Sequence, residues 1–88
     1  MAQLGADVEH LDRLGAKFKE KAAELTQMQT QISSQLKSTW WQGADADKFR
    51  AQWDGDLLSQ LTKLKALLET TAVTVARQAA DQRAASQS

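Results

Sequence analysis

The sequence predicts an all-α fold in which two long helices form an antiparallel hairpin. The chain of 88 residues contains no proline and only four glycines, a composition that favours long helices over turn-rich β architecture. Apolar residues recur in two stripes at steps of three and four, the period of one face of a helix. Only residues 38–44 separate the stripes, and a connection that short makes the two helices antiparallel neighbours. We therefore expect one helical-hairpin domain over residues 1–88.

The first helix is expected over residues 7–39. Its apolar stripe consists of Val8, Leu11, Leu14, Phe18, Ala22, Leu25, Met28, Ile32, Leu36 and Trp40. Asp7 is the predicted N-cap, because its carboxylate can accept a hydrogen bond from an orphan backbone N–H of the first turn. Trp40 follows Leu36 by four residues and is therefore expected to be the last residue of the hairpin core before the turn.

The second helix is expected over residues 45–82. Its stripe consists of Ala46, Phe49, Trp53, Leu57, Leu61, Leu64, Leu68, Ala72, Val75 and Ala79. Asp45 and Asp47 lie where carboxylates complement the positive end of a helix dipole. Phe49 and Trp53 continue the core face toward the turn, so we expect them to pack within the hairpin.

Two features of the second helix are less regular. Gly55 is unfavourable by about 1 kcal/mol relative to alanine in a helix interior. We interpret it as a tolerated weak point or a site of close packing rather than a break in the helix. The final stretch has no apolar side chain larger than alanine, so we expect residues 83–88 to be a disordered tail.

The second helix carries more leucine than one neighbouring helix could cover. Leu58 and Leu67 lie beside the main stripe and widen its apolar face. A rod of two helices has no closed core, so we expect the hairpin to dimerise into a four-helix bundle. The leucines expected at this partner interface are Leu57, Leu58, Leu61, Leu64, Leu67 and Leu68.

The sequence lacks the residue patterns of a catalytic or metal site. His10 is the only histidine and the chain has no cysteine. The aspartates around residues 45–56 lack the glycine and closing glutamate of an EF-hand loop. No glycine-rich loop or nucleophile elbow is present, and a hairpin offers no deep pocket. We expect no enzyme activity and no cofactor.

The charge balance argues against nucleic acid and lipid as partners. Eleven basic and eleven acidic side chains cancel, whereas a protein that grips phosphate backbones usually has a basic surface. A membrane-surface helix usually has a lysine-rich polar face, and here that face is mixed in charge. We therefore favour a partner helix over a lipid surface.

The stretch "WWQGADADKFRAQW", residues 40–53, resembles the WXG family of small type VII secretion proteins, which are early secretory antigenic target-like. The resemblance rests on Trp41 and Gly43 as the Trp-x-Gly motif, followed by small and acidic residues and then spaced aromatic residues. Its helical-hairpin organisation also matches over nearly the whole chain. We expect Trp41 and Gly43 to close the hairpin, with the indole packing across the helix ends. The glycine is expected to allow a backbone conformation or a close approach that a Cβ would resist.

The resemblance implies a protein that works as a helical dimer and is exported. Members dimerise with themselves or with a sister protein, and leave the cell without a cleaved signal peptide through a machine driven by a DNA-translocase-like ATPase. The first residues, "MAQLGADVEHLD", lack the basic and apolar regions of a secretory signal peptide. We therefore expect synthesis in the cytoplasm and a secreted or cell-surface location, with membrane contact only at the secretion machine.

Family members often carry Tyr-x-x-x-Asp or Tyr-x-x-x-Glu after the second helix as an export signal. This chain has no tyrosine, and the nearest frame has Arg77 in the aromatic place and Asp81 in the acidic place. A guanidinium cannot fill an apolar pocket as a phenol does. We therefore expect a sister subunit to carry the complete signal to the ATPase, which favours a heterodimer over a homodimer.

Two other functions stay open at this point. The hairpin could be an intracellular adaptor or chaperone that shields a helical segment of a secreted toxin or another client. It could also be a membrane-active amphipathic protein. Secretion of the chain itself separates the first alternative from an exported protein, and binding to liposomes tests the second.

Overall fold

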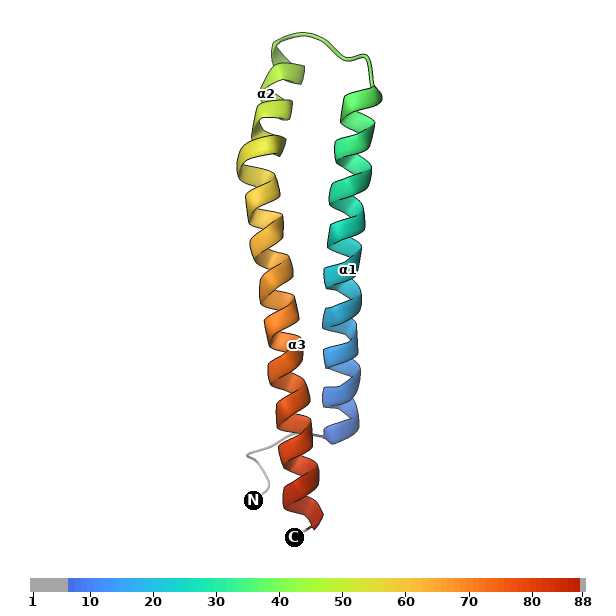
Figure 1. The fold of residues 1–88 in the computed structure, drawn as a ribbon, viewed down its shortest axis with the longest axis vertical. Helices are drawn as coiled ribbons and strands as arrows, with labels where there is room; N and C mark the ends of the chain where they lie inside the picture. The colour runs from blue at the N-terminus through green and yellow to red at the C-terminus, as the bar shows by residue number, and fades with distance from the viewer. Residues whose placement is uncertain (1–6, 88) are drawn as a thin grey trace.

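The computed structural model describes residues 7–87, which fold into an all-helical hairpin (Figure 1). The first arm is α1 (Val8–Ser38). The second arm consists of α2 (Ala44–Gln52), the π-helical turn η1 (Trp53–Leu57) and α3 (Leu58–Gln87). The arms run side by side in opposite directions, so that the start of α1 and the end of α3 lie at the same end of the molecule. The prediction of an all-α hairpin is confirmed, and dimerisation stays a prediction.

The start of α1 is fixed by Asp7, as the sequence predicts. Asp7 has an extended backbone, and its carboxylate accepts a hydrogen bond of 2.9 Å from the backbone N–H of His10. This bond satisfies one of the orphan donors of the first turn. Helix α1 therefore begins at a side-chain cap.

The second arm extends beyond its predicted end. Helix α3 continues to Gln87, so the predicted disordered tail is wrong for residues 83–87, and Ser88 lies outside the described residues. The guanidinium of Arg83 donates a hydrogen bond to the carboxylate of Asp12 on α1 and forms an ion pair with it. This surface ion pair joins the arms near the end of α3, and its hydrogen bond to Asp12 raises the pKa of Arg83.

The two arms meet along a seam with a heptad period. Residues that are buried or half-buried recur on both helices at alternating steps of four and three, which is the spacing of a two-helix coiled coil. On α1 these seam residues are Leu11, Gly15, Phe18, Ala22, Leu25, Gln29, Ile32 and Leu36. On α3 they are Leu61, Lys65, Leu68, Ala72, Val75, Ala79 and Gln82.

The seam is narrow near the free ends of the arms and wide near the turn. A Cβ built on Gly15 would lie 3.6 Å from Cγ1 of Val75 and 3.7 Å from the carbonyl oxygen of Ala72, so the backbones approach closely there. Near the turn the larger side chains of Trp53 and Arg50 reach across to Ser33 and Leu36 of α1. Figure 1 shows the corresponding divergence of the arms toward the turn.

A π-helical turn interrupts the second arm where the sequence places Gly55. The backbone N–H of Leu58 donates to the carbonyl of Trp53, five residues earlier, and to that of Gly55. A Cβ on Gly55 would have no heavy atom within 4 Å. The interpretation of Gly55 as a site of close packing is therefore wrong, and the weak point is a local widening of the helix.

The close approach at Gly15 predicts how much volume the seam accepts. Replacing Gly15 by alanine adds a Cβ at ordinary van der Waals distances, so we expect a gain of up to about 1 kcal/mol from helix propensity. Replacing it by leucine overpacks the site and is expected to cost about 1–3 kcal/mol. Urea unfolding measures both changes. Equal stability of the two variants would show that the helices are not in close contact at this point.

The Asp7 cap predicts a pH-dependent helix start. The N–H of His10 donates to the Asp7 carboxylate and lowers its pKa from the ordinary 3.8. A lowered pKa in the folded state gives stability that is full above the ordinary value and is lost as the pH falls through the lower folded value. Amide exchange in the first turn of α1 should therefore accelerate in that acidic range. Asp7→Ser keeps an acceptor but no charge, so it should abolish the pH dependence and keep the cap.

Candidate protein-protein interface

The connection between the arms consists of residues 39–43 and depends on Gly43. Gly43 has φ 124°, a conformation that L side chains rarely adopt, and it is the N-cap residue of α2. Its carbonyl accepts a hydrogen bond of 3.0 Å from the backbone N–H of Asp47. Glycine is therefore required at this position by the backbone, and not by a close approach, since a Cβ there would have no heavy atom within 4 Å. Asp45 and Asp47 lie in the first turn of α2 as predicted.

Arg50 ties the second arm to the end of α1, a role that the sequence reasoning missed. Its guanidinium donates to the carbonyl oxygens of Trp41 at 2.7 Å, Leu36 at 3.1 Å and Thr39 at 3.2 Å. The last carbonyls of a helix have no partner within the helix, so Arg50 acts as a C-cap supplied by the other arm. Arg50 follows the stripe residue Ala46 by four residues, and this spacing is the sequence signal that puts it on the core face of the helix.

Three aromatic rings form a column beside this cap. The ring centroids of Trp41 and Phe49 lie 6.2 Å apart, and those of Phe49 and Trp53 lie 6.3 Å apart. Trp53 is buried, and its indole N–H donates to the hydroxyl of Ser33 on α1 at 2.8 Å. The structure thus brings Trp41, Phe49 and Trp53 together, and the guanidinium of Arg50 lies 5.7 Å from the Trp41 ring.

Trp40 does not belong to this column. Trp40 is 84% exposed, so the prediction that it is the last core residue of the hairpin is wrong. Helix α1 ends at Ser38, and Thr39 has an extended backbone with ψ 127°. The helical spacing from Leu36 is therefore lost before Trp40 is reached, and its side chain leaves the core face.

The six leucines expected at a partner interface divide into three pairs. Leu61 and Leu68 are half-buried seam residues that pack between the two arms of the hairpin. Leu64 and Leu67 are 43% and 61% exposed. Leu57, the last residue of the π turn, and Leu58, the first residue of α3, are half-buried.

A groove between the arms marks one face of the hairpin, and the exposed leucines can be placed relative to it. The groove has a volume of about 240 Å³ and is lined by Leu11, Asp12, Gly15, Ala16 and Lys19 of α1 and by Ala72 and Ala76 of α3. At about 100° per residue, Leu14 points about 160° away from the direction of Asp12, and Leu67 points about 180° away from that of Ala76. Both leucines therefore lie on the opposite face of the hairpin.

This opposite face is called the leucine face below, and it is defined by Leu14 and Met28 of α1, Leu57 of η1, and Leu64 and Leu67 of α3. Leu14 and Met28 are fourteen residues apart, and Leu57 and Leu64 are seven apart, spacings that return to nearly the same side of a helix. Leu14, Leu64 and Leu67 are exposed and the other two are half-buried. The hairpin thus presents apolar side chains that its own seam does not cover.

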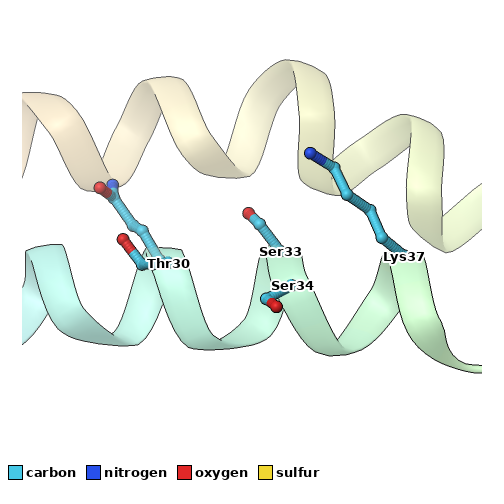
Figure 2. A pocket seen from close by; sticks show the side chains of 5 residues that line it. Thr30, Ser33, Ser34 and Lys37 are labelled. Carbon is cyan, nitrogen blue, oxygen red and sulfur yellow. The ribbon is translucent and has the colours of Figure 1, made fainter.

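A second groove near the turn is polar (Figure 2). It is lined by Gln29, Thr30, Ser33, Ser34 and Lys37 of α1 and has a volume of about 390 Å³. Its lining contains one cation and no carboxylate, histidine or cysteine. The buried Nε2 atom of Gln29 has no hydrogen-bond partner among the described residues. This lining offers hydrogen bonds but no acid–base pair or nucleophile with its base.

The structure places Arg77 and Asp81, which the resemblance suggests as a degenerate export signal, on the surface of α3. Arg77 and Asp81 are exposed and one helical turn apart. Over residues 7–87, no group of histidine and carboxylate side chains could hold a metal ion. None of the helices in that range is long and apolar enough to cross a membrane.

The cap formed by Arg50 predicts that the hairpin becomes less stable when the guanidinium group is replaced. Arg50→Lys keeps the charge, but one ammonium group cannot reach the three carbonyls with the planar geometry of a guanidinium. We expect a loss of about 1–3 kcal/mol in the free energy of unfolding, measured with urea. Arg77→Lys, on the exposed side of α3, is the matched control and should change it by less than about 0.5 kcal/mol. Equal effects of the two changes would contradict the capping role.

Comparison with known proteins identified no relative of this chain. No protein-family model, curated protein or solved structure matches the chain. The likeness of residues 40–53 to the WXG family therefore stays a resemblance, and export and partnership stay predictions.

Proposed function

We propose that this chain is a non-enzymatic subunit of a helical protein complex, similar to the WXG proteins of type VII secretion. The hairpin packs its leucine face against a related hairpin to make a four-helix bundle. The observation that carries the proposal is the exposure of Leu64 and Leu67 on an arm whose seam is already filled. Burying one leucine side chain contributes about 1.5–3 kcal/mol, so a partner that covers this face gains stability from it.

The proposal gives the turn a separate role from the leucine face. Trp41 and Gly43 lie at one end of the molecule, whereas Leu64 and Leu67 lie along the second arm (Figure 1). In the turn, Arg50 donates a hydrogen bond to the carbonyl of Trp41, and Gly43 allows the positive φ that the chain needs there. A partner bound to the leucine face leaves Trp40 and the exposed edge of Trp41 free to meet a further component.

Export in the proposed complex depends on the partner. The frame of Arg77 and Asp81 lacks an aromatic residue, so the sister subunit supplies the tyrosine-based signal that the secretion ATPase reads. The chain is made in the cytoplasm and leaves folded, as half of the dimer. No cofactor takes part.

The leucine face predicts which substitutions abolish partner binding. The test uses co-purification of this chain with the product of the neighbouring open reading frame. Leu67→Glu places a charge in the centre of the proposed interface and should weaken binding by at least about tenfold, since the change also costs the burial of one leucine. Val73→Glu is the matched control, because Val73 is 54% exposed on the same helix but points about 120° away from Leu67. Equal binding by both variants would remove the leucine face from the proposal.

Secretion assays then separate export from an adaptor role. Trp41→Ala and Gly43→Ala should lower the amount of both subunits outside the cell, because the first removes the end of the aromatic column and the second strains the turn. Normal secretion of both variants would count heavily against the proposal. An adaptor would stay in the cell while its client leaves.

A further inference from the structure

The second arm contains one residue more than its packing pattern needs. From Leu61 to Gln82 the seam residues of α3 follow steps of four and three. On α2 the residues that face α1 also keep this rhythm, because Ala46, Arg50 and Trp53 are four and three residues apart. Leu61, however, follows Trp53 by eight residues, where one heptad would give seven.

The π turn η1 (Trp53–Leu57) lies between these two regular stretches. A hydrogen bond from an N–H to the carbonyl five residues earlier encloses one residue more than the α-helical bond. Leu58 makes such a bond to Trp53. Leu57 and Leu58 are both half-buried, so two neighbouring residues occupy what is a single step of the seam elsewhere.

We propose that residues 54–56 hold a one-residue insertion, and that the π turn is a phase corrector for the second arm. It lets the cap residues near the turn and the seam residues of α3 face α1 at the same time. In a continuous α-helix with the same number of residues, Arg50 and Trp53 would be rotated by about 100° relative to that seam. Arg50 could then not reach the carbonyls at the end of α1, and Trp53 could not reach Ser33.

The alternative cause of the π turn is local. Gly55 has a low helix propensity, and the aspartates beside it compete for backbone hydrogen bonds. If propensity were the cause, a better helix former at position 55 would convert the segment to α-helix. If the register is the cause, the π turn persists whatever residue stands there, since the surplus residue is still present.

Three variants of the full-length chain distinguish these causes. Deletion of Gly55 removes the surplus residue at a point where the chain is exposed and a Cβ would touch nothing. Deletion of Ala66, an exposed residue in the regular part of α3, is the matched control, because it removes one residue that the heptad needs. Gly55→Ala keeps the length and changes only the propensity.

The register account gives a distinct result for each variant. Deletion of Gly55 should leave the Tm within about 4 °C of the parent chain or raise it, whereas deletion of Ala66 should lower it by more than about 8 °C. In the Gly55 deletion, the indole N–H of Trp53 should stay as protected from hydrogen exchange as before, since its bond to Ser33 remains in phase. Gly55→Ala should keep the Cα chemical shifts of a π turn at residues 54–57.

Two results would overturn the proposal. One is a fall in Tm, or a failure to fold, on deletion of Gly55 that is as large as the effect of deleting Ala66. The other is conversion of residues 53–57 to regular α-helix in Gly55→Ala. Neither result depends on a partner or on export, because both are read on the hairpin itself.

Discussion

The close contact of α1 and α3 at their small seam residues is the constraint on which the rest of the hairpin depends. Gly15 lies against Val75 and Ala72 without room for a large side chain. Small residues let the backbones approach, but each of them removes little apolar area from water. The seam is therefore narrow, and the remaining leucines of α3 lie outside it. The exposed leucine face follows from the same choice of residues that closes the arms.

The end near the turn solves a different packing problem. The arms diverge there, and the space is filled by Trp53 and by the long side chain of Arg50. Both side chains carry polar groups into the gap, and each finds a partner on or next to α1, the hydroxyl of Ser33 or the free carbonyls at the helix end. A buried polar group with a partner fixes the relative position of two elements more narrowly than apolar contact does. The register of the arms is set at this end.

The two packing regimes explain why the second arm is not one continuous α-helix. The cap near the turn and the seam near the free ends each fit a heptad, but they are one residue out of step. The π turn takes up the difference at the boundary between them. The resulting hairpin presents apolar side chains such as Leu64 and Leu67 on its surface, which agrees with the proposed role in binding another helical protein.

The sequence by itself determined the all-α fold, the two arms and the Asp7 cap, because periodicity and capping are local properties that a stripe of residues expresses directly. The burial of Trp53 was also predictable from its place in the apolar stripe. Gly43 was expected at the turn from the Trp-x-Gly resemblance, either for its backbone conformation or for a close approach. Only the tertiary structure decided the exposure of Trp40, the capping by Arg50, the π turn and the helical end at residues 83–87. The Arg50 cap and the contact of Arg83 with Asp12 join arms that are far apart in the sequence, and the exposure of Trp40 follows from the end of α1 at Ser38. Helical periodicity within one arm carries no information about these features.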